Sequence, residues 1–174
     1  YLYFRKIRKK EDSLRYKEKL SKINIERGDG FLVWLHVASV GEAMSILPLI
    51  ESCIKEKKIN RILITSITLS SGKILENRYK NNNKVNHQFL PFDIAVLINK
   101  FLDHWKPNLS ILIDSEIWPN LILKISERKI PLLLVNARIT KKSFDRWRLF
   151  KNFAREIFEK FDLCIVSNRI AKIF

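Results

Sequence analysis

Three carboxylates in this 174-residue chain lie where acid–base chemistry is possible. Glu42 follows Ser39 by three residues, and Asp114 and Glu116 lie two residues apart, each pair just after an apolar run. A carboxylate within about 3 Å of a hydroxyl can accept its proton as a general base. The spacing of Ser39 and Glu42 also fits a capping box, in which both side chains bind free backbone N–H groups at a helix start. The residues alone leave both interpretations of Glu42 open.

Hydroxyl groups and one arginine could bind a substrate beside these carboxylates. Thr65, Thr68 and Ser70 belong to a hydroxyl-rich run before an expected helix, where they could hold an anion or a sugar, or simply cap the helix. Arg138 could clamp a phosphate or a carboxylate through its guanidinium group. It could equally form an ion pair with Glu116, so its role is also open.

The candidate residues follow apolar runs that are typical of buried strands, and amphipathic stretches separate these runs. Such alternation predicts an α/β fold: a Rossmann-like parallel sheet with helices on both faces. Ligands bind such sheets at the carboxyl ends of the strands, where we expect Gly41 to allow a tight turn. The expected strands are 31–37, 61–65, 87–90, 109–113, 130–135 and 163–166, and the expected helices are 43–57, 71–79, 93–105, 119–128 and 142–160.

The composition favours an acidic partner. Lys and Arg number 33 against 18 Asp and Glu, a formal net charge of +15. Nucleic acid, anionic lipid and phosphorylated substrates all fit this charge. A basic helix with interleaved aromatics at 142–160 supports one alternative function, a nucleic-acid-binding α/β module. A non-catalytic membrane-surface domain is another.

Several site classes have no sequence signature here. The chain lacks the glycine fingerprint of dinucleotide sites, the ligand spacings of zinc sites and the nucleophile elbow of hydrolases. Cys53 and Cys164 are widely separated, so neither a disulfide framework nor a metal site is expected. The three histidines are scattered, and we expect structural roles for them.

Residues 1–29 differ in character from the rest of the chain. Aromatic residues at 1–4 precede a cluster of cations at 5–10, the order found where a membrane anchor meets the cytoplasm. A solvated basic helix is the alternative. We therefore predict a basic membrane-proximal lead-in at 1–29 and one domain at 30–174. Because the chain begins with Tyr1, we expect it to be a fragment.

Four segments together resemble the N-terminal half of the 3-deoxy-D-manno-octulosonic acid (Kdo) transferases of lipopolysaccharide biosynthesis. They occur in the family's order, at 34–42, 90–93, 115–121 and 135–138. The resemblance implies the N-terminal half of a GT-B glycosyltransferase, in which two Rossmann-like halves face each other across a cleft. In this family the N-terminal half binds the acceptor, and most of the donor site lies in the C-terminal half.

The resemblance also implies a reaction: inverting transfer of Kdo from CMP-Kdo to a lipid A precursor, tetraacyldisaccharide 1,4′-bisphosphate. No metal and no other cofactor is expected. The expected partners are CMP-Kdo, the lipid A precursor and an anionic membrane surface, and nucleic acid is not expected. The implied location is the cytoplasmic face of the inner membrane. Without a donor half, we expect the 174 residues alone to be inactive.

The family's motifs assign roles to individual residues. Glu42 corresponds to the general base, and the residue that stabilises the transition state corresponds to Glu116 or Asp114, with Glu116 preferred. Asp114 stands where glutamate is usual in the family. The candidate substrate-binding residues are Ser39, Gly41, Thr65, Thr68, Ser70 and Arg138.

Overall fold

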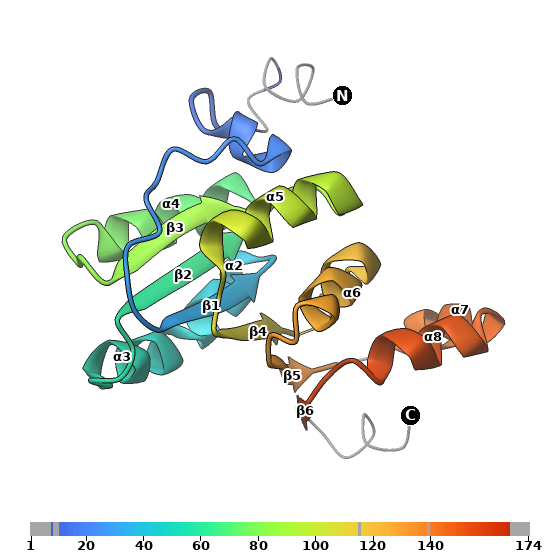
Figure 1. The fold of residues 1–174 in the computed structure, drawn as a ribbon. Coiled ribbons are helices and arrows are strands. Elements are labelled where there is room, and N and C mark those ends of the chain that lie inside the picture. The colour runs from blue at the N-terminus through green and yellow to red at the C-terminus, as the bar shows by residue number, and fades with distance from the viewer. Residues whose placement is uncertain (1–7, 9–10, 115, 139, 168–174) are drawn as a thin grey trace.

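The computed structural model describes residue 8 and residues 11–114, 116–138 and 140–167. Its centre is one parallel sheet of six strands in the order β3-β2-β1-β4-β5-β6 (Figure 1). The strands are β1 (Leu32–Val37), β2 (Arg61–Ser66), β3 (Val85–Phe89), β4 (Leu109–Ile113), β5 (Leu132–Ala137) and β6 (Leu163–Val166).

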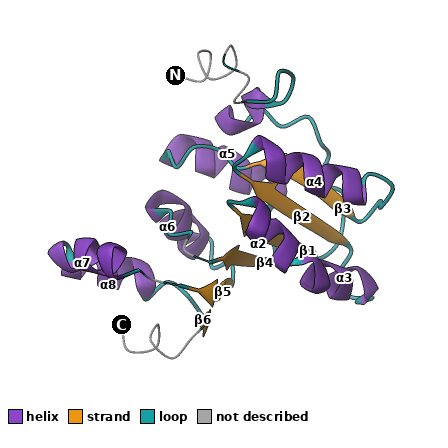
Figure 2. Ribbon diagram, turned by 180° about the vertical axis from the view of Figure 1, so that it is seen from behind, coloured by secondary structure: helices purple, strands orange, loops and turns teal. Residues whose placement is uncertain are grey.

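Helices cover both faces of this sheet, as Figure 2 shows from behind. One face packs against α2, α3 and α4, and the other against α5, α6 and α8. The predicted Rossmann-like α/β architecture is therefore confirmed. The helices are η1 (Tyr16–Leu20), α2 (Val40–Ser45), α3 (Leu47–Lys55), α4 (Leu69–Tyr79), α5 (Ala95–Trp105), α6 (Pro119–Glu127), α7 (Lys141–Leu149) and α8 (Lys151–Phe158).

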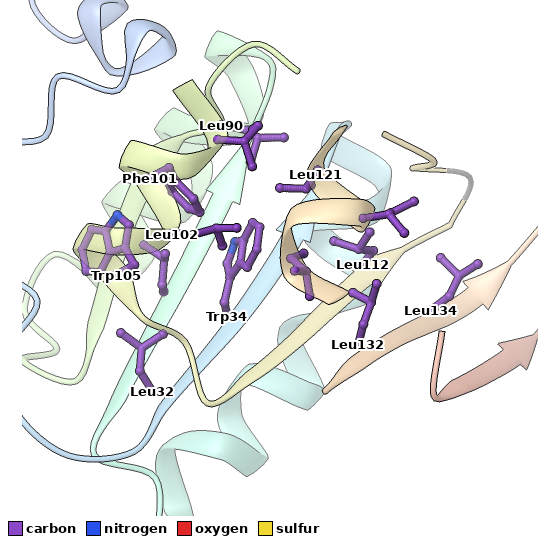
Figure 3. Close-up of a cluster of buried hydrophobic side chains, with 14 of the residues drawn as sticks. Leu32, Trp34, Leu90, Phe101, Leu102, Trp105, Leu112, Leu121, Leu132 and Leu134 are labelled. Atoms are coloured by element: carbon purple, nitrogen blue, oxygen red, sulfur yellow. The ribbon is translucent and has the colours of Figure 1, made fainter. Parts of the chain in front are cut away.

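Strand β1 lies at the centre of the sheet, and all six of its residues are buried. Its side chains alternate between the two faces: Trp34 joins the cluster beneath α5 and α6, whereas Leu35 joins the cluster beneath α2, α3 and α4. The Trp34 ring lies 5.0 Å from that of Phe101 on α5 (Figure 3). Burial on both faces explains why this strand is a continuous apolar run rather than an alternating one.

The chain changes direction across the sheet between β1 and β4. These strands are neighbours, with Leu35 paired to Ile111. From β1 the chain moves to β2 through α2 and α3, and from β4 it moves the opposite way to β5 through α6. In such sheets the loops that follow the two strands diverge and leave a crevice at the carboxyl edge. We call the region between residues 38–42 on one side and residues 114 and 116–118 on the other the crevice.

The described part of the predicted lead-in packs against the edge strand β3. The Glu18 carboxylate accepts a hydrogen bond from the Phe89 N–H at 2.8 Å. Arg15 donates to the His87 carbonyl at 2.7 Å, and the Lys19 carbonyl accepts from the Phe92 N–H at 3.1 Å. Residues 1–7, 9 and 10 lie outside the described residues, and the boundary at residue 30 stays a prediction. In the part of the chain that the structure describes, no helix is long and apolar enough to cross a membrane.

Two of the predicted helices are each two helices. The stretch 43–57 divides at Ile46, and Pro48, in the first turn of α3, has no N–H to continue the preceding helix. The stretch 142–160 divides at Phe150, whose backbone is not helical (φ −121°, ψ 49°). The prediction of a single long helix there is wrong. The break lets Trp147 on α7 pack against Phe153 and Phe158 on α8, with ring centroids 6.4 and 5.6 Å apart.

Candidate functional site

Glu42 lies in the first turn of α2, directly after β1. Ser39 is the N-cap of this helix, and its hydroxyl accepts from the Glu42 N–H at 3.3 Å. The Glu42 carboxylate accepts from the Ala38 N–H at 2.7 Å and from the Ser39 hydroxyl at 2.9 Å. The predicted cap by Ser39 is thus confirmed, whereas the Glu42 carboxylate binds the N–H of Ala38, one residue before the N-cap. The carboxylate is half-buried and oriented by two donors at the edge of the crevice, so the geometry also suits a base.

Gly41 does not make the tight turn predicted for it. It lies within α2, and among the described glycines only Gly28 and Gly30 have a positive φ. A Cβ added to Gly41 would meet only the Ser39 hydroxyl oxygen, at 3.9 Å. The missing side chain instead leaves open surface beside Glu42, where a ligand can approach the backbone closely.

Asp114 and Glu116 follow β4 on the other side of the crevice. Asp114 has left-handed backbone (φ 64°), which aspartate tolerates better than most residues, and its N–H donates to the Val135 carbonyl at 2.9 Å. The Glu116 carboxylate accepts from the Trp118 indole N–H at 2.6 Å, and the same oxygen lies 3.6 Å from His36 Nε2. The structure therefore places the Glu116 carboxylate beside the end of β1, shortly before Glu42 in the chain, and Asp114 beside β5.

Arg138 follows β5, the next strand of the sheet. Its Nε lies 3.8 Å from the Asp114 carboxylate, and its side chain is 60% exposed. Of the two predicted interactions, the pairing with a carboxylate is observed, but it involves Asp114 rather than Glu116. The exposed guanidinium is still accessible to an anion at the crevice.

The hydroxyl-rich run that begins at the end of β2 divides into buried and exposed parts. Thr65 is fully buried on β2, where its hydroxyl oxygen lies 2.8 Å from both Trp34 Nε1 and His36 Nδ1. Thr68 caps α4 by accepting from the Ser71 N–H at 3.3 Å, as one of its two interpretations predicted. Ser70 lies exposed in the first turn of α4. Ligand contacts of these residues stay predictions.

Sequence reasoning missed Asp93, which connects two of the four family-like segments. Its carboxylate accepts from the backbone N–H groups of Leu121 at 2.8 Å and Asn120 at 3.1 Å, at the start of α6. The Asn120 side chain donates back to the Asp93 carbonyl at 2.8 Å. Asp93 thus fixes the beginning of α6, directly after the loop of Glu116. Asp93 precedes α5 in the sequence but caps α6. The sequence alone does not show that the start of α5 lies beside the start of α6, so this role could not be recognised from it.

His87 lies on β3 and contacts Ser66, the last residue of the neighbouring strand β2. Burial lowers its pKa to about 3, and the Arg15 charge acts in the same direction. Because Arg15 lies 3.1 Å from Nδ1 and can only donate, Nδ1 accepts and the Nε2–H donates to the Ser66 hydroxyl at 2.9 Å. His87 is therefore a neutral structural residue.

Within the described ranges, no group of three or more His, Cys, Asp or Glu side chains could hold a metal ion. Reactions without a metal or other cofactor stay a prediction for this protein.

Residues 11–172 match the family of 3-deoxy-D-manno-octulosonic-acid transferases (kdotransferases). The chain belongs to this family. The probable mitochondrial 3-deoxy-D-manno-octulosonic acid transferase of Arabidopsis thaliana is 40% identical over 147 residues, which are 84% of this chain and 32% of that protein. The Rickettsia bellii transferase is 39% identical over 167 residues, 96% of this chain and 39% of that protein. The Haemophilus influenzae transferase is 27% identical over 139 residues, 80% of this chain and 32% of that protein. The chain thus spans about a third of the length of these curated relatives.

Solved structures show the same fold at low sequence identity. The UDP-GlcNAc 2-epimerase from Neisseria meningitidis, bound to UDP-GlcNAc, has a TM-score of 0.58 and 14% identity over 82% of this chain and 42% of that chain. A second UDP-N-acetylglucosamine 2-epimerase has a TM-score of 0.55 and 13% identity over 83% of this chain and 44% of that chain. The likeness concerns the fold alone, and it confirms the prediction of a Rossmann-like half of GT-B type.

Proposed function

We propose that the complete enzyme transfers Kdo from CMP-Kdo to a lipid A precursor, and that this domain binds the acceptor and supplies Glu42 as the general base. The observation that carries the proposal is the Glu42 carboxylate. Two short hydrogen bonds orient it at the edge of the crevice, in a chain that belongs to the Kdo transferase family. The open surface at Gly41 gives an acceptor hydroxyl access to it.

The proposed chemistry is one inverting displacement. A sugar hydroxyl is a poor nucleophile near neutral pH, so Glu42 takes its proton as the oxygen attacks the anomeric carbon of Kdo. The bond between that carbon and the phosphate oxygen breaks at the same time, and CMP leaves with the electron pair. The proton ends on Glu42, and the new glycosidic bond joins acceptor and Kdo.

Glu116 and Arg138 have complementary parts in this proposal. Positive charge develops on the sugar ring as the donor bond lengthens, and the Glu116 carboxylate across the crevice stabilises it electrostatically. The departing phosphate gains negative charge, which suits a cation such as the exposed Arg138. Asp114 keeps Arg138 at the edge of the sheet through their ion pair.

The α7–α8 region suits an anionic membrane surface, where the acceptor of the proposed reaction resides. Leu149 is 78% exposed and Phe150 is 67% exposed. They lie next to Arg148 and Lys151 in the sequence, and both of these cations are exposed. Apolar side chains among cations favour the boundary between lipid headgroups and acyl chains. We propose that this surface faces the cytoplasmic leaflet of the inner membrane.

The test of Glu42 uses the full-length protein and follows Kdo transfer from CMP-Kdo to the lipid A precursor. Glutamine at position 42 still accepts a hydrogen bond at the helix start but cannot take up a proton. We expect Glu42→Gln to lower kcat at least about 100-fold. We also expect the free energy of unfolding to change by less than about 1 kcal/mol.

The matched control is Glu51→Gln on α3, because Glu51 makes a partly exposed ion pair with Arg78 at 3.7 Å, away from the crevice. This control should keep wild-type activity. If Glu42→Gln keeps most of its activity, Glu42 is only a helix cap and the base is another residue. If the wild-type enzyme transfers no Kdo, the proposed function itself is wrong.

A further inference from the structure

His36 lies near the end of β1, directly beneath the crevice. Its side chain is fully buried, in an otherwise apolar strand. Nδ1 lies 2.8 Å from the Thr65 hydroxyl, whereas Nε2 has no hydrogen-bond partner among the described residues. Nε2 lies 3.6 Å from a carboxylate oxygen of Glu116.

The carboxylate beside Nε2 favours one of the two neutral forms of the His36 ring. The Trp34 indole N–H can only donate, so the Thr65 oxygen accepts from it at 2.8 Å. That oxygen has a second lone pair and a proton of its own, so its contact with Nδ1 fits either form of the ring. A proton on Nε2 faces the Glu116 carboxylate oxygen at 3.6 Å, whereas a lone pair there would face a negative charge. In the form with the proton on Nε2, the Thr65 hydroxyl donates to Nδ1, and Trp34, Thr65 and His36 form a buried chain of hydrogen bonds that leads toward the carboxylate.

We infer that His36 is a positioning residue that holds Glu116 through its Nε2–H, an inference that rests on the proposed role of Glu116 in Kdo transfer. The Trp118 indole N–H already donates to the same carboxylate oxygen at 2.6 Å. A second donor on that oxygen fixes the rotation of the carboxylate and leaves its other oxygen for the ligand.

The observed distance agrees with a bond that completes on ligand binding. At 3.6 Å, Nε2 is a few tenths of an ångström beyond ordinary N–H···O distances. Hydrogen bonds in active sites without ligand are often long and shorten when substrate is bound. Burying an unpaired N–H is costly, so the free energy favours the movement of Glu116 toward His36.

A purely structural histidine would need only its contact with Thr65. Two substitutions separate these roles. Asparagine at position 36 places its amide oxygen near the position of Nδ1, so it keeps the contact with Thr65 but falls short of Glu116. Glutamine is longer, and its amide N–H group reaches toward the position of Nε2.

The test measures Kdo transfer by the full-length protein and its variants. We expect His36→Asn to lower kcat about 10- to 100-fold, the usual effect of a misplaced catalytic group, with little change in KM. His36→Gln should recover most of this loss. The double variant His36→Asn/Glu116→Gln should be no worse than Glu116→Gln, because residues that act as a unit are not additive. Full activity of His36→Asn, or additive losses in the double variant, would overturn the inference.

A measurement without catalysis separates this inference from the proposed function. If the wild-type enzyme transfers no Kdo, the proposed function fails, and NMR of the 15N-labelled histidines in this chain decides the placement of His36. We expect the Nε2–H form of His36 and a change of its Nε2 resonance in Glu116→Gln. An Nδ1–H form, or no response to Glu116→Gln, would contradict the inference.

Discussion

The two edges of the sheet are built differently. At the β3 edge, residues 11–29 cover the strand with buried polar contacts, such as the Lys19–Glu11 ion pair at 2.7 Å, whose side chains are 6% and 4% exposed. At the β6 edge, Leu163 and Ile165 are each 49% exposed. Among the described side chains of α7 and α8, Ile157 is the one that is buried.

This difference indicates that the β3 edge stabilises the fold, whereas the β6 edge presents surface that can take part in binding. At the β3 edge, the buried charged groups need their partners, because a charge taken out of water without its partner is costly. At the β6 edge, the fold does not account for the exposed leucine, isoleucine and phenylalanine side chains. Exposed apolar side chains of this kind are suited to contacts with another surface. We therefore expect substitutions to unfold the first region and to leave the second folded but altered in binding.

The largest contrast is expected from two phenylalanine substitutions. Phe101 on α5 is fully buried against Trp34, so Phe101→Ala should lower the free energy of unfolding by about 3–5 kcal/mol. Phe150 is 67% exposed, so Phe150→Ala should change the free energy of unfolding by less than about 0.5 kcal/mol. Urea unfolding followed by circular dichroism measures both values.

The same Phe150→Ala variant tests the proposed membrane surface. In co-sedimentation, we expect it to bind vesicles with anionic lipid less than wild type does, while Phe101→Ala, where it stays folded, binds like wild type. A large loss of stability for Phe150→Ala with unchanged vesicle binding would show that Phe150 stabilises the fold and does not contribute to membrane binding.

A smaller contrast is expected from two arginines that each form an ion pair. Arg15 binds the Glu18 carboxylate at 2.7 Å and the His87 carbonyl at 2.7 Å, and its side chain is 20% exposed. Arg15→Met removes the cation that pairs with the half-buried Glu18 carboxylate and a donor to the His87 carbonyl, and it should cost about 3 kcal/mol. Arg155 pairs with Glu159 at 2.6 Å, but both side chains are more than half exposed, so Arg155→Met should not measurably change the unfolding curve. Equal losses would show that α8 is as integral to the fold as the β3 edge.

The smallest contrast is in the response to pH. His87 has a pKa of about 3 in the folded chain and about 6.5 when unfolded. Between these values the unfolded chain binds a proton that the folded chain does not. Stability is therefore fully present above pH 6.5 and is lost as the pH falls from 6.5 toward 3. From about pH 7.5 to about pH 5 the loss should be about 2 kcal/mol.

Urea unfolding at both pH values measures this loss, and His87→Gln should reduce the difference. The β5–β6 half of the sheet has no histidine, so near pH 5 we expect hydrogen exchange to increase first at the β3 edge. A variant with the same pH dependence as wild type would exclude His87 as the cause.

The sequence predicted the sheet well because burial on both faces makes its strands short apolar runs. The strands at 109–113 and 163–166 have the predicted bounds. The division at Phe150 could not be predicted, because the helical pattern continues through it and the contacts of Trp147 with α8 decide the break.

For the candidate site, the sequence indicated the carboxylates but not their environment. Ser39 and Glu42 interact locally, so their capping contacts follow from spacing alone. His36 depends on Thr65, 29 residues away, and on Glu116, which lies in a different loop. Contacts of this kind need the strand order, which the alternation of strands and helices does not provide.

The reversal of direction between β1 and β4 also affects when the crevice forms during folding. Pairing β1 with β2 joins Leu32 to Arg61, whereas pairing β1 with β4 joins Val33 to Leu109, a far longer closure along the chain. Contacts between distant residues cost more chain entropy and form more slowly. During synthesis Glu42 emerges early, but it stands at the edge of an unfinished sheet. Only after β4 has left the ribosome and joined β1 can the Glu116 carboxylate reach its place beside His36 at the end of β1.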